Sequence, residues 1–401
     1  MTEANNEKIS ELITRGVENI YPTPAALIKV LESGKKLKLY QGFDPTGIKL
    51  HIGHMVGLQK LRQWQDLGHE VIFLIGDGTG QAGDPSGKTR AREKYLTNKE
   101  LKENAKDYVM QAGKIVQFEG KNAAKILYNG EWLNKLSLVD VLNIADNFSL
   151  QQLEERDLYV KRKAANETIS MREFLYPILQ AYDSVAMEVD LELGGDDQTF
   201  NMLCGRNLSK KMLGKEKFVM TTPLLSDSTG RKIGKTEGNV IALDSKPNDL
   251  FGMIMSLPDD VIIKCFELIT TVPMDEVQFM KREMLIGKLN PRDAKARLAK
   301  EIVTLLNSKE EAGIAEKAFS DTFSKGEIPT DIEEIKIEKG QSAMQVLVAK
   351  SIVSSGSEWR RLVENGAVKN VEGEKITDIN FTPTKTTVLR IGKKTFVKIV
   401  L

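Results

Sequence analysis

A strand–helix–strand pattern in the first quarter of the chain most constrains its fold. Residues 37–43 (Leu-Lys-Leu-Tyr-Gln-Gly-Phe) alternate as a strand does, and residues 71–75 (Val-Ile-Phe-Leu-Ile) form the continuous apolar run of a buried parallel strand. Between them, apolar residues recur every three positions over 54–67 until Gly68 provides a C-terminal stop, which predicts a helix. Parallel strands joined by a helix bind ligands at their carboxyl ends, so we expect the functional site there.

Two of the three histidines lie in one tetrapeptide, His51-Ile52-Gly53-His54, where the strand pattern gives way to the helical one. At a helix N-terminus, unpaired backbone N–H groups and the helix dipole favour an anion, and two imidazoles can donate further hydrogen bonds to phosphate. Gly53 leaves room for a flat base against the backbone. A single histidine near a helix start usually serves as a cap or surface group, so a phosphate site requires a second element.

A glycine-flanked loop, Gly230-Arg231-Lys232-Ile233-Gly234-Lys235-Thr236-Glu237-Gly238-Asn239, is the candidate second element. Its two lysines are mobile cations suited to pyrophosphate, although most lysine-rich loops are only solvated surface. Gly87-Lys88-Thr89 is not part of a P-loop, because the glycine which that motif requires at position 82 is alanine here. The histidine and lysine segments together, in this order, favour ATP chemistry.

Composition sets the broad class of the protein. With 401 residues, 41% of them hydrophobic, the chain is long enough for about two or three domains with a real core. It has no run of about 18 apolar residues, and Met1–Arg15 is polar and acidic, so we expect no membrane span, no signal peptide and a cytoplasmic location. Cys204 and Cys265 are too few for a disulfide framework or a zinc site, and no protein-bound metal is predicted.

The middle of the chain continues the α/β pattern. The segments 137–157 and 173–182 are predicted to be helical, with Pro177 near the start of the second. Residues 185–193 alternate as a strand and lead into Gly194-Gly195-Asp196-Asp197-Gln198, which we interpret as a loop at a strand end.

The pattern changes again toward the C-terminal end. Residues 248–326 are predicted to form a separate helical domain, 328–334 a linker, and the remainder short mixed elements that end in the basic strand 393–398. From Lys336 to Leu401 the chain carries 12 Lys and Arg against 6 Asp and Glu, a charge of +6, whereas residues 1–335 carry −5. Such a basic tail fits a protein whose end binds a polyanion, although it can also be merely solvated.

These segments resemble the class I aminoacyl-tRNA synthetases, in which a His-Ile-Gly-His loop and a lysine loop of the Lys-Met-Ser-Lys-Ser type enclose ATP. The closer resemblance is to the tyrosyl-tRNA synthetase family. The segments similar to that family, in its order, are Tyr40–Thr46, Gly83–Lys88, Gln180–Asp183 and Gly195–Gln198. Ser357–Leu362 with Gly366–Val368 resembles the family's small S4-type RNA-binding domain, so the resemblance covers nearly the whole chain.

The resemblance implies a three-part architecture. It implies a Rossmann-like parallel α/β catalytic domain over 1–240 with an inserted helical dimer-interface segment, a helical anticodon-binding domain over 241–330, and an α+β S4-like RNA-binding domain over 331–401. The family works as a homodimer, and apolar helix within 130–180 fits an interface, although a buried core helix looks the same. RNA binding by the last domain is assigned to Arg360, Arg361, Lys393 and Lys394.

The resemblance also implies a reaction. The carboxylate of L-tyrosine attacks the α-phosphate of ATP to give tyrosyl-adenylate and pyrophosphate, and a terminal ribose hydroxyl of tRNA(Tyr) then takes the tyrosyl group. Catalysis is therefore positioning and stabilisation of phosphate charge, shared with Mg²⁺, without a protein nucleophile. The residues assigned to catalysis are Thr46, His51, His54, Lys88, Lys232, Lys235 and Thr236. Those assigned to ATP binding are Asp44, Gly53, Asp197 and Lys235.

Amino-acid selection is assigned by the same resemblance. Tyr40 and Asp183 meet the phenolic hydroxyl, and phenylalanine would leave both unpaired, at a greater cost than a missing methylene. The residues assigned to the ammonium group are Asp84, Tyr176 and Gln180, with Asn129 and Gln198 lining the same pocket. Without the resemblance, Tyr40 would be typical of a core tyrosine and Asp183 of a helix cap.

The chain departs from the family pattern at several positions. Asp196 stands where the family usually has a small or hydroxyl residue, so it competes with Asp197 for the ribose of ATP. Gly234 removes a hydroxyl from the lysine loop and loosens it. Gln41 and Gly57 also differ from the commonest pattern, so the resemblance supports no contact for them.

Three other functions fit parts of this pattern. A tryptophan-specific synthetase shares the fold and both signatures, but Tyr40 with Asp183 favours a phenol over an indole. Other nucleotidyltransferases with a His-x-Gly-His loop are short chains without a helical domain and a basic tail. A catalytically silent RNA-binding splicing or assembly factor on the same scaffold is disfavoured by the intact lysines and pocket residues. No membrane or DNA partner is expected.

Overall fold

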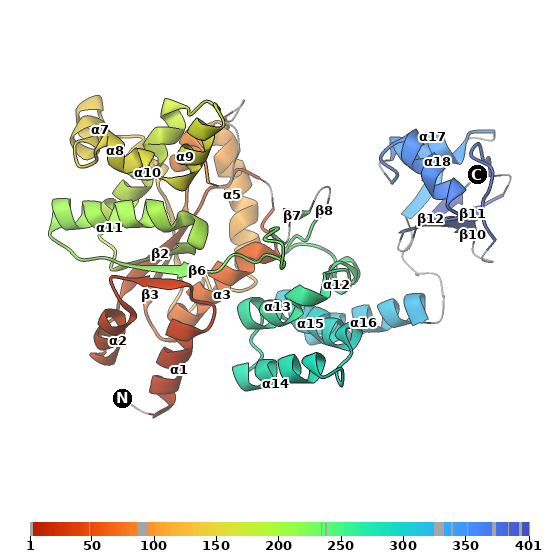
Figure 1. Ribbon diagram of the computed structural model, residues 1–401, viewed down its shortest axis with the longest axis horizontal. Coiled ribbons are helices and arrows are strands. Elements are labelled where there is room, and N and C mark those ends of the chain that lie inside the picture. Colours follow the sequence, from red (N-terminus) through yellow and green to blue (C-terminus); the bar gives the residue numbers. More distant parts are fainter. Residues whose placement is uncertain are drawn as a thin grey trace. The chain divides into compact units, whose positions relative to one another are not determined.

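The computed structural model describes residues 3–47, 49–86, 95–233, 235–236, 239–324, 333–337, 340–350, 352–370, 374–383, 385–392 and 395–400. The chain divides into two compact units, Met1–Gly313 and Ile314–Leu401. The first contains a large sheet together with most of the helices, and the second contains a smaller sheet (Figure 1).

A six-stranded sheet in the order β1-β6-β5-β2-β3-β4 forms the centre of the first unit. Its strands are β1 (Asn19–Tyr21), β2 (Lys38–Phe43), β3 (Glu70–Ile75), β4 (Lys125–Tyr128), β5 (Leu191–Gly195) and β6 (Phe218–Thr222). Neighbours from β6 to β4 run parallel, and β1 lies antiparallel to β6 at the edge. The predicted parallel α/β domain is confirmed, including the pair β2 and β3 at its centre.

Helices cover both faces of this sheet. Helix α3 (Ile52–Asp66) connects β2 to β3 and packs on both, burying the apolar stripe predicted for it, and Gly68 follows with a φ of +80°. Figure 1 shows α10 and α11 on the opposite side from α1 and α2. Outside the segment 137–164, the other described α-helices before residue 240 are α1 (Glu3–Thr14), α2 (Pro24–Glu32), α4 (Thr79–Ala82), α5 (Asn98–Ala112), α6 (Gly130–Leu133), α10 (Met171–Ala186) and α11 (Thr199–Leu213).

The segment predicted as helical over 137–157 is divided into short helices. These are α7 (Leu138–Ala145), α8 (Leu150–Glu154) and the beginning of α9 (Asp157–Ala164). Ser137 and Ser149 start α7 and α8 as N-caps, since each hydroxyl accepts a hydrogen bond from the backbone N–H group three residues later. The division follows from this local capping.

Helix α10 is longer than predicted, and the strand predicted over 185–193 is confirmed only at its end. The helix continues to Ala186, and β5 begins only at Leu191. Val185 packs in a helix–helix core with Ile144 and Leu208, so its apolar side chain serves that core rather than the sheet. Pro177 lies inside α10 rather than near its start.

The remainder of the first unit is helical, as predicted for 248–326 within the described residues. Its helices are α12 (Pro247–Met255), α13 (Ile262–Ile269), α14 (Met274–Leu285), α15 (Pro291–Leu306) and the start of α16 (Lys309–Ser324). Before them, β7 (Lys235–Thr236) and β8 (Asn239–Val240) form a two-stranded hairpin. Helix α13 packs against α3, the helix that begins at the histidine tetrapeptide.

The second unit contains the end of α16 and, after it, a four-stranded sheet in the order β10-β11-β12-β9 with the helices α17 and α18 and its own apolar core. Its elements are β9 (Glu333–Lys336), α17 (Ala343–Ala349), α18 (Gly356–Glu364), β10 (Val368–Asn370), β11 (Thr387–Ile391) and β12 (Thr395–Val400). The linker predicted over 328–334 is wrong at its end, because β9 begins at Glu333 and pairs with β12. Across the described residues of both units, no helix has the length and apolarity needed to cross a membrane.

Candidate active site

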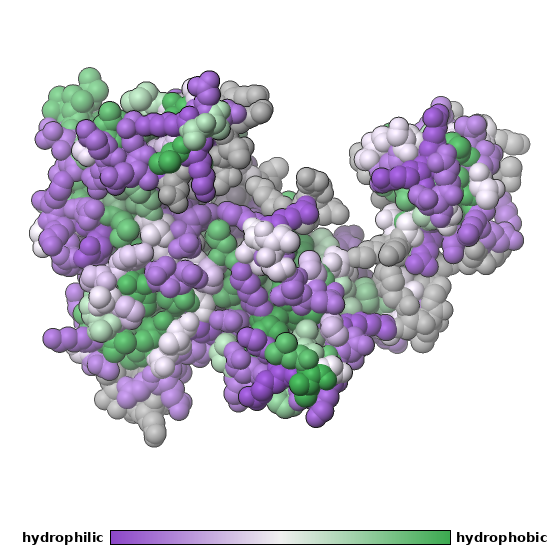
Figure 2. Space-filling model, in the orientation of Figure 1, coloured by the Kyte–Doolittle hydropathy of each residue, from purple (hydrophilic) through white to green (hydrophobic). Residues whose placement is uncertain are grey.

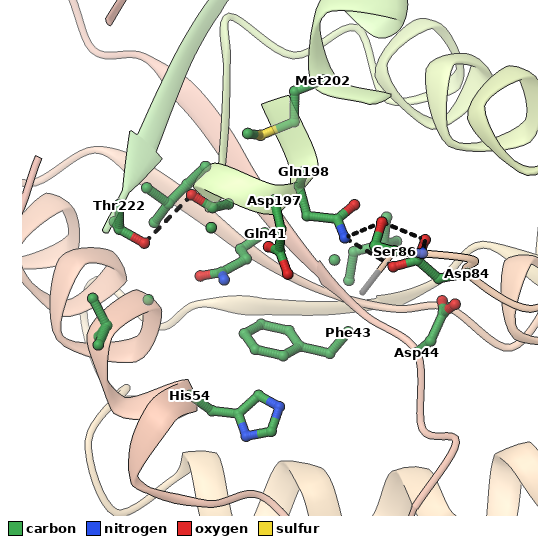
Figure 3. A pocket seen from close by; sticks show the side chains of 18 of the residues that line it. Gln41, Phe43, Asp44, His54, Asp84, Ser86, Asp197, Gln198, Met202 and Thr222 are labelled. Carbon is green, nitrogen blue, oxygen red and sulfur yellow. Dashed lines mark hydrogen bonds between the residues drawn. The ribbon is translucent and has the colours of Figure 1, made fainter. Parts of the chain in front are cut away.

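A cavity of about 410 Å³ opens at the carboxyl ends of the central parallel strands, where the sequence predicted a site. Figure 3 shows part of its lining: Asp197 and Gln41 extend into the same space, with Phe43 and His54 opposite. The predicted site residues that line the cavity are Tyr40, Asp44, Thr46, His51, Gly53, His54, Asp84, Asn129, Tyr176, Gln180, Asp183, Asp197, Gln198 and Lys232. Residues spread over almost 200 positions of sequence therefore meet at one site.

The histidine tetrapeptide forms the N-terminus of α3. His51 is the N-cap: its Nδ1 accepts from the Gly53 N–H at 3.1 Å, while the Nδ1 of His54 accepts from the His51 N–H at 3.0 Å. Because each Nδ1 is an acceptor, the ring proton of each neutral imidazole lies on Nε2. The same two histidines therefore cap the helix and present Nε2–H donors.

Gly53 permits a close contact within the protein, and the contact with a flat base stays a prediction. A Cβ at this position would lie 2.9 Å from Cε1 of His51 and 3.5 Å from the carbonyl oxygen of Ile233. Gly57 also permits a close contact, in this case with Gln41, because a Cβ at position 57 would lie 2.4 Å from the amide of Gln41. The glycine at 57 thus makes room for the glutamine at 41, two departures from the family pattern that fit each other.

The segment directly after the lysine loop is joined to the histidine segment through backbone hydrogen bonds. Ile52 N–H donates to the Ile241 carbonyl at 3.0 Å, and Leu243 N–H donates to the Leu50 carbonyl at 3.1 Å. Within the loop, Lys232 Nζ lies 2.9 Å from Asp197 Oδ2. Both of these side chains are partly exposed, at 51% and 29%, so the pair is a weakly held surface contact.

Several predicted residues are not covered by the structure. Lys88 lies outside the described residues. The backbone of Lys235 and Thr236 forms β7, but their side chains are not described.

The inner end of the cavity is a buried polar cluster around Asp183 and Tyr40. Asp183 accepts from Asn129 Nδ2 at 3.0 Å and from Trp132 Nε1 at 2.8 Å, while the Tyr40 hydroxyl lies 3.1 Å from Ser184 Oγ. Burial raises the pKa of Asp183, and the two donated hydrogen bonds lower it in part. Burial together with neighbouring carboxylates raises the pKa of Tyr40, which therefore stays a neutral phenol.

Carboxylates also face the middle of the cavity. Asp44 accepts from the Tyr176 hydroxyl at 2.9 Å and from Thr79 Oγ1 at 2.7 Å. Asp84 accepts from Gln198 Nε2 at 2.8 Å, and Figure 3 shows this contact. Burial raises the pKa of Tyr176, and the charge of Asp44 raises it further. The middle of the cavity therefore concentrates negative charge, which suits a cation such as an ammonium group.

Sequence reasoning missed several residues that complete the site. Trp132 lies three residues after Asn129, so an Asn-x-x-Trp spacing on one helical turn could have indicated it. Arg156 donates to Ser86 Oγ at 2.6 Å and lies 3.7 Å from Asp84, which brings the end of the inserted segment to the cavity. Glu192 lines the cavity as well, but nothing in the sequence distinguished it from an ordinary strand residue.

The two adjacent aspartates at 196 and 197 differ in position. Asp197 lines the cavity, whereas Asp196 is not among the described residues that line it. The carboxylate of Asp196 instead accepts from Thr199 Oγ1 at 3.2 Å, close to the N-terminus of α11.

The second unit holds the other predicted group. Arg360 and Arg361 are exposed on α18, beside Trp359, which is fully buried and donates to the Ile379 carbonyl at 2.8 Å. Lys393 and Lys394 lie outside the described residues.

Comparison with known proteins gives a consistent result. Residues 32–324 match the family described as tRNA synthetases class I (W and Y). The tyrosine–tRNA ligase of Carboxydothermus hydrogenoformans is 43% identical over 403 residues, which cover 97% of each chain. The tyrosine–tRNA ligase of Dehalococcoides mccartyi (strain ATCC BAA-2266 / KCTC 15142 / 195) is 40% identical over 403 residues and 100% of each chain. A solved structure, the C-terminally truncated mitochondrial tyrosyl-tRNA synthetase of Coccidioides posadasii, has a TM-score of 0.63 at 27% identity, covering 77% of this chain and 91% of that one.

Proposed function

The chain belongs to the class I tRNA synthetases and, within them, to the tyrosine–tRNA ligases, and we propose that its cavity holds L-tyrosine at the inner end and ATP beside the histidine loop. The protein joins tyrosine to tRNA(Tyr) at the expense of ATP. In the first step the tyrosine carboxylate attacks the α-phosphate, the bond to the bridging oxygen breaks, and pyrophosphate leaves with that oxygen. In the second step a ribose hydroxyl of the tRNA end attacks the tyrosyl carbonyl, and AMP leaves.

Catalysis in this proposal is charge stabilisation by groups already in place. His51 and His54 direct Nε2–H donors toward the phosphates, because their Nδ1 atoms are occupied by the cap hydrogen bonds. Thr46 lines the same wall. Lys232 lines the cavity as well, and Lys88, Lys235 and Thr236 are proposed to act with it on the phosphates. No side chain forms a covalent intermediate, so the rate gain comes from orientation and electrostatics.

Tyrosine selection rests on the buried cluster, and this is the observation that carries the proposal. Asp183 accepts a hydrogen bond from the phenolic O–H of the substrate in a site where Asn129 and Trp132 already donate to both carboxylate oxygens. Tyr40 makes a second hydrogen bond to the same hydroxyl. Phenylalanine would bury this carboxylate and this hydroxyl without the hydrogen bonds that the substrate hydroxyl supplies, and an indole does not present an oxygen to them. The proposed role of Asp84, Tyr176 and Gln180 is to hold the ammonium group.

The proposed ATP contacts follow from the cavity lining. Asp197 faces the cavity and is the proposed ribose ligand, while Gly53 and Asp44 border the same region. Among the described residues there is no group of three His, Cys, Asp or Glu side chains that would hold a metal ion. Mg²⁺ is therefore proposed as a companion of the ATP phosphates, whose charge it would share.

A homodimer is proposed from the exposed apolar side chains of α7. Leu138, Val139 and Leu142 are 75%, 63% and 59% exposed, and Figure 2 shows hydrophobic residues gathered over this helix. An exposed apolar face of this kind is typical of a subunit interface. A Leu142→Glu variant is expected to be monomeric by light scattering.

The second unit is proposed to be an S4-like RNA-binding domain. Its small sheet with α17 and α18, the basic charge of residues 336–401 and the outward-facing Arg360 and Arg361 support this assignment. The helices α12–α16 are proposed to bind the anticodon side of tRNA(Tyr). The proposed compartment is the cytoplasm, where ATP and tRNA are both supplied.

ATP–pyrophosphate exchange with each amino acid supplied separately tests the proposal. Exchange with tyrosine alone is the expected result. Exchange with tryptophan alone would overturn the assignment of Tyr40 and Asp183, and no exchange with any amino acid would overturn the proposed chemistry.

A further inference from the structure

An ion pair that the proposed chemistry does not use adjoins the inner end of the cavity, which its glutamate helps to line. Lys217, just before β6, and Glu192, in β5, have side chains that are 0% and 2% exposed, and Lys217 Nζ contacts Glu192 Oε2. Glu192 also lies opposite Tyr40 across the β2–β5 pair. Burial lowers the pKa of Lys217, while the charge of Glu192 raises it.

Lys217 is connected through a serine to Tyr40, the residue proposed to bind the phenolic hydroxyl of the substrate. Lys217 Nζ donates to Ser184 Oγ at 2.7 Å, and Ser184 Oγ lies 3.1 Å from the Tyr40 hydroxyl. One lone pair of the serine oxygen is therefore occupied by the ammonium group, which restricts how the serine and tyrosine hydroxyls can orient. The position and direction of the Tyr40 hydroxyl thus depend on Lys217.

The glutamate end reaches the residue proposed to hold the ammonium group. Glu192 Oε1 accepts from Gln180 Nε2 at 3.0 Å, and Asn201 Nδ2 donates to Gln180 Oε1 at 3.0 Å. These two contacts fix which way the Gln180 amide faces, because its NH₂ must meet the carboxylate and its oxygen must meet the Asn201 donor. The amide oxygen is then held as an acceptor for a cation.

We propose that Glu192 and Lys217 are a positioning pair that determines tyrosine specificity, by holding Tyr40 through Ser184 and Gln180 directly. The inference rests on the proposed tyrosine site. A buried ion pair adds little stability over an apolar pair of the same volume, whereas removing one partner leaves a buried charge uncompensated. The pair therefore has its main effect on the two pocket residues that it orients, one at each end of the substrate.

The experiment compares Glu192→Gln, Lys217→Met and the double variant in ATP–pyrophosphate exchange. Each single change is expected to raise KM for tyrosine roughly tenfold and to lower the tyrosine-to-phenylalanine ratio of kcat/KM by a similar factor, as for coupled neighbours. KM for ATP should stay within about twofold, because the pair touches only the tyrosine end. The double variant should recover part of the tyrosine-to-phenylalanine ratio. Without the Lys217 ammonium group, the amide introduced at position 192 can form hydrogen bonds with Gln180 and Ser184 and no buried charge is left unpaired.

Arg162→Met provides the matched control, because Arg162 and Glu173 form a second buried pair, at 3.0 Å, whose members do not line the cavity among the described residues. This variant should lower the melting temperature but leave both KM values and the tyrosine-to-phenylalanine ratio of kcat/KM unchanged.

If Glu192→Gln and Lys217→Met also lower only the melting temperature and leave the KM values and this ratio unchanged, the positioning role is refuted. If Lys217→Met does not fold, the isosteric Glu192→Gln carries the same test. A wild-type protein without tyrosine-dependent exchange would refute the proposed function itself, whereas an active wild type with an unchanged ratio in the variants refutes only this inference.

Discussion

The two ends of the cavity are built differently. At the proposed tyrosine end, Asp183 and Tyr40 are almost fully buried, and each is held by hydrogen bonds within the protein. At the proposed phosphate end, the histidines are fixed by helix capping, but Lys232 is half exposed and, among the described residues, is held by a surface pair with Asp197. One end is a buried network, and the other combines a fixed wall with a loosely held lysine.

The difference matches the tasks of the two ends. Selection against phenylalanine needs polar groups that cannot find another partner when the substrate hydroxyl is missing, and only burial provides that. Charge that develops on leaving pyrophosphate needs cations that approach it, and an exposed lysine gives up little when it leaves a surface ion pair. We therefore expect changes at the tyrosine end to alter binding and specificity, and changes at the phosphate end to alter rate.

The largest effect is expected from Asp183→Asn. An amide at this position cannot accept from Asn129, Trp132 and the substrate hydroxyl together, and each lost buried hydrogen bond costs about 1–3 kcal/mol, so kcat/KM for tyrosine should fall by about 10³. ATP–pyrophosphate exchange measures the loss. Asp190→Asn, a nearby carboxylate that does not line the described cavity, is the control. A fall of less than tenfold would mean that the buried network does not select tyrosine.

Lys235→Ala tests the phosphate end. The rate of adenylate formation should fall by about 10², because one charge-stabilising donor is lost in the transition state, while KM for tyrosine stays unchanged. Single-turnover kinetics with saturating tyrosine separates the chemical step from binding. Equal losses in rate and in tyrosine affinity would remove the distinction between the two ends.

Acidification is expected to lower the free energy of unfolding through a histidine beside the start of β2, the strand that carries Tyr40. His69 Nδ1 accepts from the Leu37 N–H at 3.1 Å, next to the start of β2, and burial lowers the pKa of His69 from 6.5 to about 4. Below pH 6.5 the unfolded chain binds a proton that the folded protein does not, so this contribution to stability, complete above pH 6.5, is lost as the pH falls toward 4. Between pH 6.5 and about 5 the loss is about 2 kcal/mol.

Urea unfolding of the wild type and of His69→Gln at about pH 7 and about pH 5 measures this contribution. The glutamine keeps an acceptor for the Leu37 N–H but does not titrate, so its free energy of unfolding should fall less between the two pH values. The same fall in both proteins would contradict the assignment.

The smallest effect concerns the Lys232–Asp197 pair. Lys232→Met should change the free energy of unfolding by less than about 1 kcal/mol, because both side chains are partly exposed, and added salt should reduce this small difference further by screening the pair. Urea unfolding at low and high salt provides the measurement. A loss above about 2 kcal/mol would mean that Lys232 is a structural residue and is not held loosely for ATP.

The sequence predicted the structure best where an element depends on residues that are close together in the chain. The histidine tetrapeptide at a strand–helix junction, the helix that follows it and the parallel pair β2 and β3 all depend on short-range periodicity and capping, and all are confirmed. The strand predicted over 185–193 begins too early, because Val185 packs between helices, which no local pattern shows, and β5 starts only at Leu191.

The buried residues that contact the site could not be predicted from the sequence, for a related reason. Lys217 and Glu192 are distant in sequence from Tyr40, and a lysine before a strand normally indicates a solvated surface. Only the sheet order, with β5 between β2 and β6, brings the three together. Ser184 was likewise unremarkable beside Asp183, until its hydroxyl proved to join Tyr40 to Lys217.

Tyrosine binding without ATP tests the division between the two ends most directly. Isothermal titration of the wild type, Asp183→Asn and Lys235→Ala compares the two ends in one equilibrium measurement. We expect the Lys235→Ala protein to bind tyrosine as tightly as the wild type, and the Asp183→Asn protein to show no measurable binding. Tight binding by Asp183→Asn, or a loss of binding in Lys235→Ala as large as that in Asp183→Asn, would contradict the account.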